Sequence, residues 1–145
     1  MSAAESFNLE RLLTDVAAWA SMHTDIQGVL LVGSYARGTA RPDSDVDLMI
    51  LTENPEVFRT DETWMQELDW SGWRAPLLSW RDEQYGPVWS RHVLLQDASD
   101  VEFSFGLPDW ANIDPLDTGT LNVVRTGARI VTDPRRLLAR LLDSS

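Results

Sequence analysis

The sequence contains no cysteine, no lysine and no long apolar run. Without cysteine, the chain can form no disulfide, no zinc–thiolate site and no thiol nucleophile. Residues 1–10 lack a basic segment ahead of an apolar stretch, and no run approaches the roughly 20 apolar residues that cross a bilayer. We therefore expect a cytoplasmic protein without a membrane span.

Positive charge is scarce, because 12 arginines stand against 23 acidic residues and give a formal net charge of -11. Binding along a nucleic-acid backbone needs clustered positive charge, so we do not expect a nucleic-acid partner. An acidic surface instead suits a cationic or metal-bridged substrate. The length of 145 residues is typical of one domain with its own core and predicts a single domain over 1–145.

The most informative pattern joins a glycine turn to a pair of carboxylates. Gly33-Ser34 is followed, after ten residues, by Asp45-Val46-Asp47. The apolar residues 29–32 and 46–51 predict two buried strands that flank this segment. Alternate residues of a strand share a face, so Asp45 and Asp47 should point to the same side, about 6 to 7 Å apart along the strand. Divalent cations can share carboxylates at this spacing.

A third carboxylate is needed if protein oxygens are to hold two cations. We choose Glu102, because the apolar residues Val101 and Phe103 flank it and alternate with it as on the first acidic strand. Asp100 and Asp97 are the alternatives, although both lie at or near a predicted turn, where acidic residues are common.

The remaining pattern predicts the other elements of an α/β chain. An amphipathic helix is expected from about Phe7 to Met22, with Ser6 or Asn8 as its N-cap. Further helices are predicted over 35–38, 61–68, 117–126 (ended by Gly127) and 134–142 (with Pro134 in the first turn). Strands are predicted over 76–81, 88–95, 100–105 and 130–131, with a turn over 70–73 and a hairpin turn over 96–99. His23 and His92 have no partner at metal-ligand spacing, and we assign them no role.

The Gly-Ser turn, the Asp-Val-Asp pair and their spacing together resemble the signature of the nucleotidyltransferase superfamily, which includes DNA polymerase beta and the antibiotic nucleotidyltransferases. The string GSYARGTARPDSDVDLMI is especially similar to small aminoglycoside or lincosamide adenylyltransferase-like proteins and to minimal nucleotidyltransferase antitoxins. The resemblance implies an α/β (α+β) nucleotidyltransferase fold, in which helices flank a mixed β-sheet.

The resemblance also implies roles for the residues of the turn. Gly33 and Ser34 would hold the triphosphate of ATP or another NTP, since glycine allows close backbone approach and serine supplies a hydroxyl. Arg37 would reach a phosphate or the base. The structural alternatives are an N-cap role for Ser34 and a surface charge for Arg37.

The carboxylates would form the metal site of such an enzyme. Asp45 and Asp47 would bind two Mg²⁺ ions, for which Mn²⁺ is a possible replacement, and Glu102 would act as a further ligand or as general base. As isolated surface residues, two aspartates on one strand face would repel each other unless a cation intervened.

The sequence leaves the acceptor of the nucleotidyl group open. Antibiotic-modifying members carry a helical domain after the catalytic one, whereas this chain ends at Ser145. The first hypothesis is transfer of AMP to a hydroxyl of a small acceptor such as an aminoglycoside, in an open cleft or in a homodimer whose partner completes the site. The second is an antitoxin that nucleotidylates or binds a partner toxin, and the third is a catalytically silent nucleotide-binding scaffold.

Overall fold

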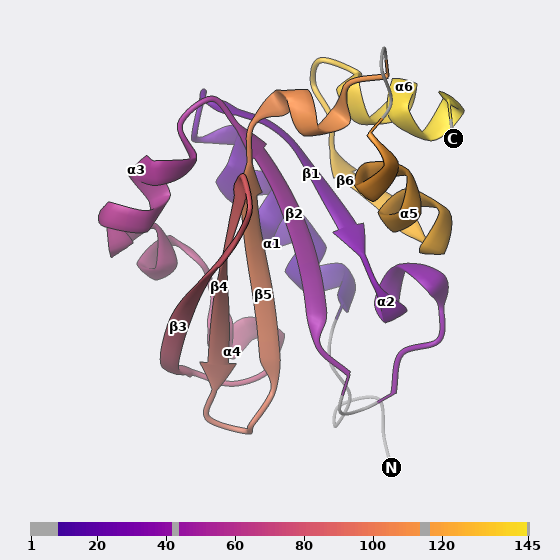
Figure 1. Cartoon of the computed structure of the whole chain (residues 1–145). Coiled ribbons are helices and arrows are strands. Elements are labelled where there is room, and N and C mark those ends of the chain that lie inside the picture. The colour runs from indigo at the N-terminus through magenta and orange to yellow at the C-terminus, as the bar shows by residue number, and fades with distance from the viewer. Residues whose placement is uncertain (1–8, 42–43, 114–116, 145) are drawn as a thin grey trace.

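The chain folds around a six-stranded β-sheet (Figure 1). The computed structural model describes residues 9–41, 44–113 and 117–144. Its helices and 3₁₀ segments are α1 (Leu9–Ser21), α2 (Ser34–Arg37), α3 (Pro55–Thr60), η2 (Glu62–Glu67), α4 (Trp70–Trp73), η3 (Pro108–Ala111), α5 (Thr118–Thr126) and α6 (Leu137–Ser144). Its strands are β1 (Ile26–Val32), β2 (Val46–Thr52), β3 (Leu77–Tyr85), β4 (Val88–Leu95), β5 (Asp100–Gly106) and β6 (Ala128–Thr132).

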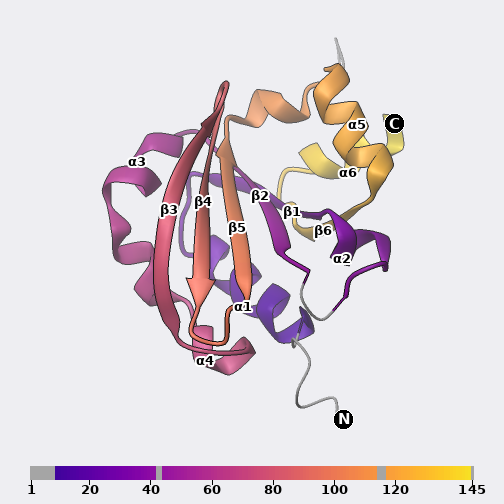
Figure 2. The same cartoon turned by 60° about the horizontal axis from the view of Figure 1, so that its bottom comes forward.

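The strands lie in the order β3-β4-β5-β2-β1-β6. Neighbouring strands are antiparallel except β2 and β5, which run parallel at the centre of the sheet. Figure 2 shows β3, β4 and β5 on one side of the molecule, and α2, α5 and α6 on the other. The predicted mixed sheet with flanking helices is therefore confirmed.

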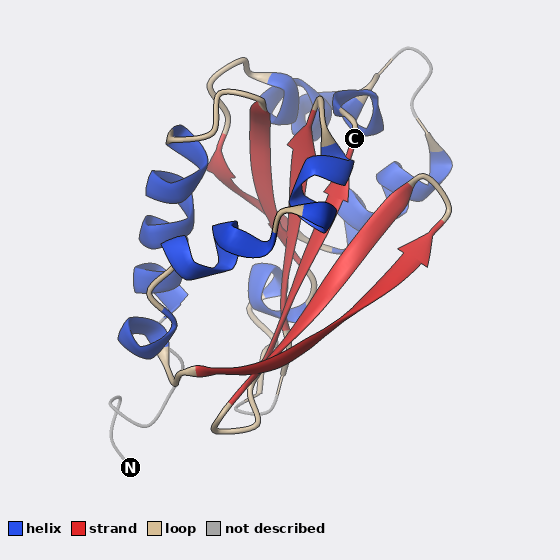
Figure 3. Cartoon of the chain, turned by 90° about the vertical axis from the view of Figure 1, so that its left-hand side faces the viewer, coloured by secondary structure: helices blue, strands red, loops and turns tan. Residues whose placement is uncertain are grey.

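One face of the sheet packs against α1 and the segment from α3 to α4. Figure 3 shows these helices along one side of the strands. The aromatic side chains that fill this layer are Trp19, Phe58, Trp64, Trp70, Trp73, Trp89, Phe103 and Phe105. Each removes a large apolar area from water, so this layer forms the main hydrophobic core.

The other face of the sheet is only partly covered. Helices α5 and α6 and segment η3 pack over β1 and β2, where Leu30, Met49 and Leu51 form a smaller apolar cluster with Val124 and Leu138. In Figure 1 the face of β3, β4 and β5 turned toward the viewer carries no described helix. Polar side chains of these strands therefore remain accessible beside the helical layer.

Most predicted elements are present, although several boundaries differ from the sequence-based expectation. The body of the first helix is confirmed, while its expected N-cap lies outside the described residues. The helix predicted over 61–68 is instead a 3₁₀ segment, η2, preceded by α3, which has Pro55 in its first turn. The predicted strand over 76–81 continues to Tyr85, because β3 pairs with β4 along its whole length.

Two further expectations were wrong because side-chain caps were not recognised. Residues 70–73 form helix α4 rather than a turn, since the Asp69 carboxylate accepts a hydrogen bond from the Gly72 amide. The last helix begins at Leu137 rather than in the first turn after Pro134. There the Asp133 carboxylate accepts hydrogen bonds from the amides of Leu138 and Ala139. Aspartate favours such positions because it satisfies amides that have no partner within the helix.

No helix in the described part of the chain is long and apolar enough to cross a membrane.

Candidate active site

The Gly33 turn connects β1 to α2 and lies against the first acidic strand. Gly33 has φ +77° and ψ -157°, a backbone conformation that essentially only glycine adopts. A Cβ atom at this position would lie 2.5 Å from Asp47 Oδ2, so glycine is also required by the close approach of the carboxylate. The turn and Asp47 therefore form one packed unit.

Ser34 is not the N-cap of α2. Gly33 occupies the N-cap position, and its carbonyl accepts hydrogen bonds from the amides of Ala36 and Arg37, both at 3.1 Å. No side chain makes a capping hydrogen bond at this helix. The structural alternative for Ser34 was therefore wrong, and its hydroxyl is not used in capping.

Asp47 and Glu102 are direct neighbours across the parallel pair β2 and β5. Both project on the face opposite to the main core, because their strand neighbours Val46, Leu48 and Val101 are buried in that core. Asp45 immediately precedes β2 at an exposed position. The alternation predicted from the sequence thus places a carboxylate of each strand on the same face.

These carboxylates disfavour one another's charge. The pKa of Asp47 is raised from 3.8 to about 7, mainly by burial and further by the negative charges of Glu102, Asp45 and Asp100. The pKa of Asp100 is also raised, first by burial and then by the charge of Asp45. A carboxylate of raised pKa beside three other acids indicates a site that would gain from a bound cation.

The donors present fit Mg²⁺ or Mn²⁺, which prefer carboxylate oxygens. The Asp100 Oδ1 atom is buried and has no hydrogen-bond partner among the described residues. In the arrangement observed, however, no three His, Cys, Asp or Glu side chains within residues 9–41, 44–113 and 117–144 are grouped as a metal site. Asp45, Asp47, Asp100 and Glu102 therefore lie near one another and have suitable ligand atoms, but their side chains would have to move closer together to bind a cation.

Residues 12–78 match the model of a family described as the nucleotidyltransferase domain. The chain resembles the nucleotidyltransferase superfamily. The matched segment contains Gly33, Ser34, Asp45 and Asp47, whereas Glu102 lies beyond it. The expected resemblance is thus confirmed.

Two solved structures align with part of this nucleotidyltransferase-like chain. An aminoglycoside 6-adenyltransferase from Bacillus subtilis aligns with a TM-score of 0.48 and 10% identity over 68% of this chain and 35% of that chain. A cytoplasmic RNA terminal U-transferase aligns with a TM-score of 0.45 and 16% identity over 67% of this chain and 29% of that chain. The chain spans about a third of the length of these two structures. No curated protein matches the sequence.

Arg37, the third predicted nucleotide-binding residue, is the last residue of α2. Its backbone packs against Gly127, which has φ +141° and ends α5; a Cβ atom there would lie 3.3 Å from the Arg37 amide nitrogen. The Arg37 guanidinium makes no hydrogen bond or ion pair with another described residue. The α5–β6 junction therefore supports α2 in this nucleotidyltransferase-like site.

His92 is the functional candidate that the sequence reasoning missed. It pairs directly with Glu102 across β4 and β5, and its Nδ1 atom lies 3.6 Å from Glu102 Oε1. The hairpin turn predicted from the sequence, with four residues over 96–99, would have paired Val93 rather than His92 with Glu102. The turn found in the structure is one residue longer and covers 95–99, and Ala98 adopts φ +71° within it. This longer turn sets the register of β4 against β5. A one-residue change of register moves every side chain to the other face.

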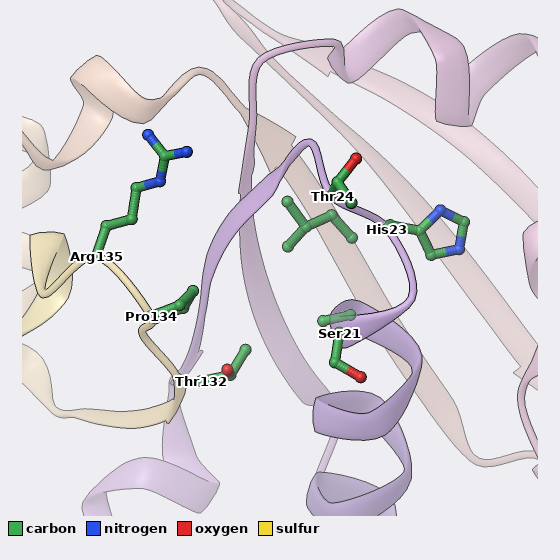
Figure 4. A pocket seen from close by; sticks show the side chains of 8 residues that line it. Ser21, His23, Thr24, Thr132, Pro134 and Arg135 are labelled. Carbon is green, nitrogen blue, oxygen red and sulfur yellow. The ribbon is translucent and has the colours of Figure 1, made fainter.

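A separate pocket lies at the other end of β1 (Figure 4). Its volume is about 360 Å³, and its lining includes Ser21, Thr24, Thr132 and Arg135. Because β1 runs from Ile26, beside this pocket, to the residue before Gly33, the two places are roughly 20 Å apart. The pocket is therefore distinct from the group of carboxylates.

Proposed function

We propose that the chain is a Mg²⁺-dependent nucleotidyltransferase that moves AMP from ATP to a hydroxyl group of a small acceptor, with release of pyrophosphate. The observation that carries this proposal is the packing of the Gly33 turn on Asp47, with Glu102 in register beside the same aspartate. A turn suited to phosphates thereby adjoins carboxylates suited to the cations that accompany them.

The turn would bind the triphosphate. Gly33 allows the backbone to approach the phosphates, and the Ser34 hydroxyl would donate a hydrogen bond to a phosphate oxygen. Arg37 would then approach the phosphates or the base from the other end of α2, where its guanidinium would supply positive charge. These contacts position the α-phosphorus, and positioning is a large part of catalysis in phosphoryl transfer.

Asp45, Asp47 and Glu102 would hold Mg²⁺, as two ions, with Mn²⁺ as a replacement. Mg²⁺ bound there would neutralise phosphate charge and lower the pKa of the acceptor hydroxyl. Glu102 completes this ligand set or takes the hydroxyl proton as general base. The acceptor oxygen forms a bond to the α-phosphorus as the bond to the pyrophosphate oxygen breaks, so the reaction needs no covalent enzyme intermediate.

A cationic acceptor such as an aminoglycoside fits the charge of the protein. The formal net charge is -11, and the accessible face beside the carboxylates carries further acidic groups, such as Glu83 on β3. Such a surface would concentrate a cation near the site. The proposal places the reaction in the cytoplasm, with the acceptor bound by a single domain or between two copies of it.

The test is pyrophosphate release from each NTP with Mg²⁺, across a panel of aminoglycosides, lincosamides and candidate partner proteins. Asp47→Asn should reduce acceptor-dependent release on the order of a thousandfold, because it removes a charge that holds the cation. The matched control is Asp109→Asn, which neutralises an exposed aspartate on η3 and should leave the rate unchanged.

The outcomes separate the hypotheses. Release that requires both Asp47 and one small cationic acceptor supports the proposal. Release that requires only a partner protein would replace the small acceptor with the antitoxin hypothesis. Silence with every acceptor, together with no binding of Mg²⁺-ATP in a calorimetric titration, would overturn the enzyme and leave a scaffold.

A further inference from the structure

We propose that His92 is a positioning residue that holds Glu102 beside Asp47 for metal binding and nucleotidyl transfer. This inference rests on the proposed function, because it gives Glu102 a partner within that site. His92 is neither a metal ligand nor a contact of the nucleotide in this proposal; it acts through Glu102.

The first argument is the position of Glu102 between two neighbouring strands. Glu102 faces Asp47 of β2 on one side and His92 of β4 on the other, since β5 lies between these strands and pairs with both at this residue. Its Oε1 atom lies 3.6 Å from His92 Nδ1, and its Oε2 atom lies 3.5 Å from the Ser104 hydroxyl. A ring nitrogen of His92 and the hydroxyl of Ser104 therefore lie near the two carboxylate oxygens of Glu102, one to each oxygen.

The second argument is that His92 is itself held in place. Its side chain is 13% exposed, and its Nε2 atom lies 3.4 Å from both the Glu83 carboxylate and the Tyr85 hydroxyl of β3. Glu83 is in turn bound by Arg81 at 3.0 Å. The two ring nitrogens therefore face oxygens of different strands, Nδ1 toward β5 and Nε2 toward β3.

His92 would fix the orientation of Glu102 from the side opposite Asp47. The charge of Glu102 raises the pKa of Asp47, and a side-chain hydrogen bond between the two carboxyl groups acts in the same direction, so Asp47 contacts Glu102 on one side and His92 lies on the other. Partners that orient metal-binding carboxylates typically change metal affinity or activity by about 10- to 100-fold when removed. We expect an effect of this size for His92.

The two ring nitrogens allow a selective test. His92→Asn retains a donor near the position of Nδ1 and hence near Glu102, whereas His92→Gln retains one near Nε2 and hence near Glu83 and Tyr85. We expect His92→Gln to lower kcat and the affinity of the protein alone for Mn²⁺, each about tenfold. His92→Asn should recover most of both, and KM for the NTP should change little in either variant.

A matched control is available at the other histidine. His23 Nε2 lies 2.8 Å from Glu67, at the other end of β1 from the carboxylates. His23→Gln therefore also alters a histidine–glutamate contact, but it should leave kcat and Mn²⁺ affinity unchanged. Thermal unfolding of each variant establishes that the variants compared are folded.

The outcomes distinguish this inference from the proposed function. Equal behaviour of the Asn and Gln variants, or unchanged kcat and Mn²⁺ affinity in both, would overturn the positioning role even in an active enzyme. Selective loss of Mn²⁺ affinity in His92→Gln would support the role even if no acceptor-dependent turnover were found. Absence of Mn²⁺ binding by the unmodified protein would overturn both.

Discussion

The two faces of the central strands β2 and β5 differ sharply, although alternate residues of the same two strands form them. The residues on one face are at most 1% exposed and form part of the main core: Val46, Leu48, Ile50, Val101, Phe103 and Phe105. On the opposite face the same strands present Asp47, Glu102 and Ser104, followed on β2 by Met49 and Leu51 of the smaller apolar cluster. The comparison teaches that the tightly packed face fixes the position of the acidic one, since a strand cannot shift by one residue without exchanging them.

The two faces also contribute to stability with opposite signs. Phe105 stacks on Trp89 with ring centroids 4.7 Å apart and on Phe58 at 5.2 Å, so burial and ring contacts both stabilise the core face. On the acidic face, burial and mutual repulsion disfavour the charge of Asp47. The core therefore offsets the cost of keeping the carboxylates together.

The largest expected effect is on the core face. Phe105→Ala should lower the free energy of unfolding by about 3 to 5 kcal/mol, because it removes a fully buried ring and leaves a cavity between Trp89 and Phe58. Urea denaturation measures the change. Leu107→Ala is the control, since Leu107 is 44% exposed and its truncation should cost less than about 0.5 kcal/mol. Equal losses in the two variants would contradict the contrast between the faces.

Local alternation in the sequence was sufficient to predict which residues face which side. The pattern at 45–47 and 101–103 depends only on the period of a strand, and both strands were predicted. A turn at Gly33-Ser34 was likewise predicted from the sequence, whereas the positive φ of Gly33 and its close approach to Asp47 are known only from the fold.

The pairing of the strands was not foreseeable in the same way. The parallel contact of β2 with β5 joins segments more than 50 residues apart, and nothing local in either strand specifies the other. The partner of Glu102 depends on the turn at Ala98, whose left-handed backbone is uncommon for alanine. His92 therefore appeared isolated in the sequence, although the sheet places it beside Glu102.

Arg91 is the exception to the apolar character of the core face. Its side chain is completely buried on β4, and its Nε and Nη2 atoms donate hydrogen bonds of 2.7 and 2.8 Å to Asp82 of β3. The guanidinium also lies within 5.8 Å of the ring centroids of Trp64, Trp80 and Trp89. The charge is tolerated because it is paired and surrounded by aromatic faces.

Substitution of Asp82, the ion-pair partner of Arg91, tests how the buried charge is tolerated. Asp82→Ala should lower the free energy of unfolding by about 3 kcal/mol, because it leaves a buried guanidinium without its carboxylate. Arg91→Met, which removes the buried charge itself, should cost less, since Asp82 is 25% exposed and can be hydrated. Chemical denaturation of both variants measures the difference, and a larger loss in Arg91→Met would show that the pair itself stabilises the core.

The smallest expected change in the free energy of unfolding is on the acidic face, and it is an increase rather than a decrease. Asp47→Asn should raise the free energy of unfolding of the metal-free protein by about 2 kcal/mol at pH 8. A pKa unit is worth about 1.4 kcal/mol, and solvent at this partly exposed carboxyl reduces the full effect of a pKa near 7. The same substitution should lower transfer on the order of a thousandfold, so stability and the proposed activity would change in opposite directions.

The pH dependence of this gain follows from the pKa of Asp47. The folded protein retains the proton between about pH 4 and 7, whereas the unfolded chain, with a pKa near 3.8, has released it. The contribution of Asp47 to stability therefore falls as the pH rises through this window, and asparagine avoids the loss. The two proteins should be equally stable near pH 4 and should diverge up to about pH 7, as thermal unfolding in a chelator can measure. Added Mg²⁺ at pH 8 should then stabilise the unmodified protein but not Asp47→Asn, because the bound cation would compensate the repulsion that asparagine has already removed.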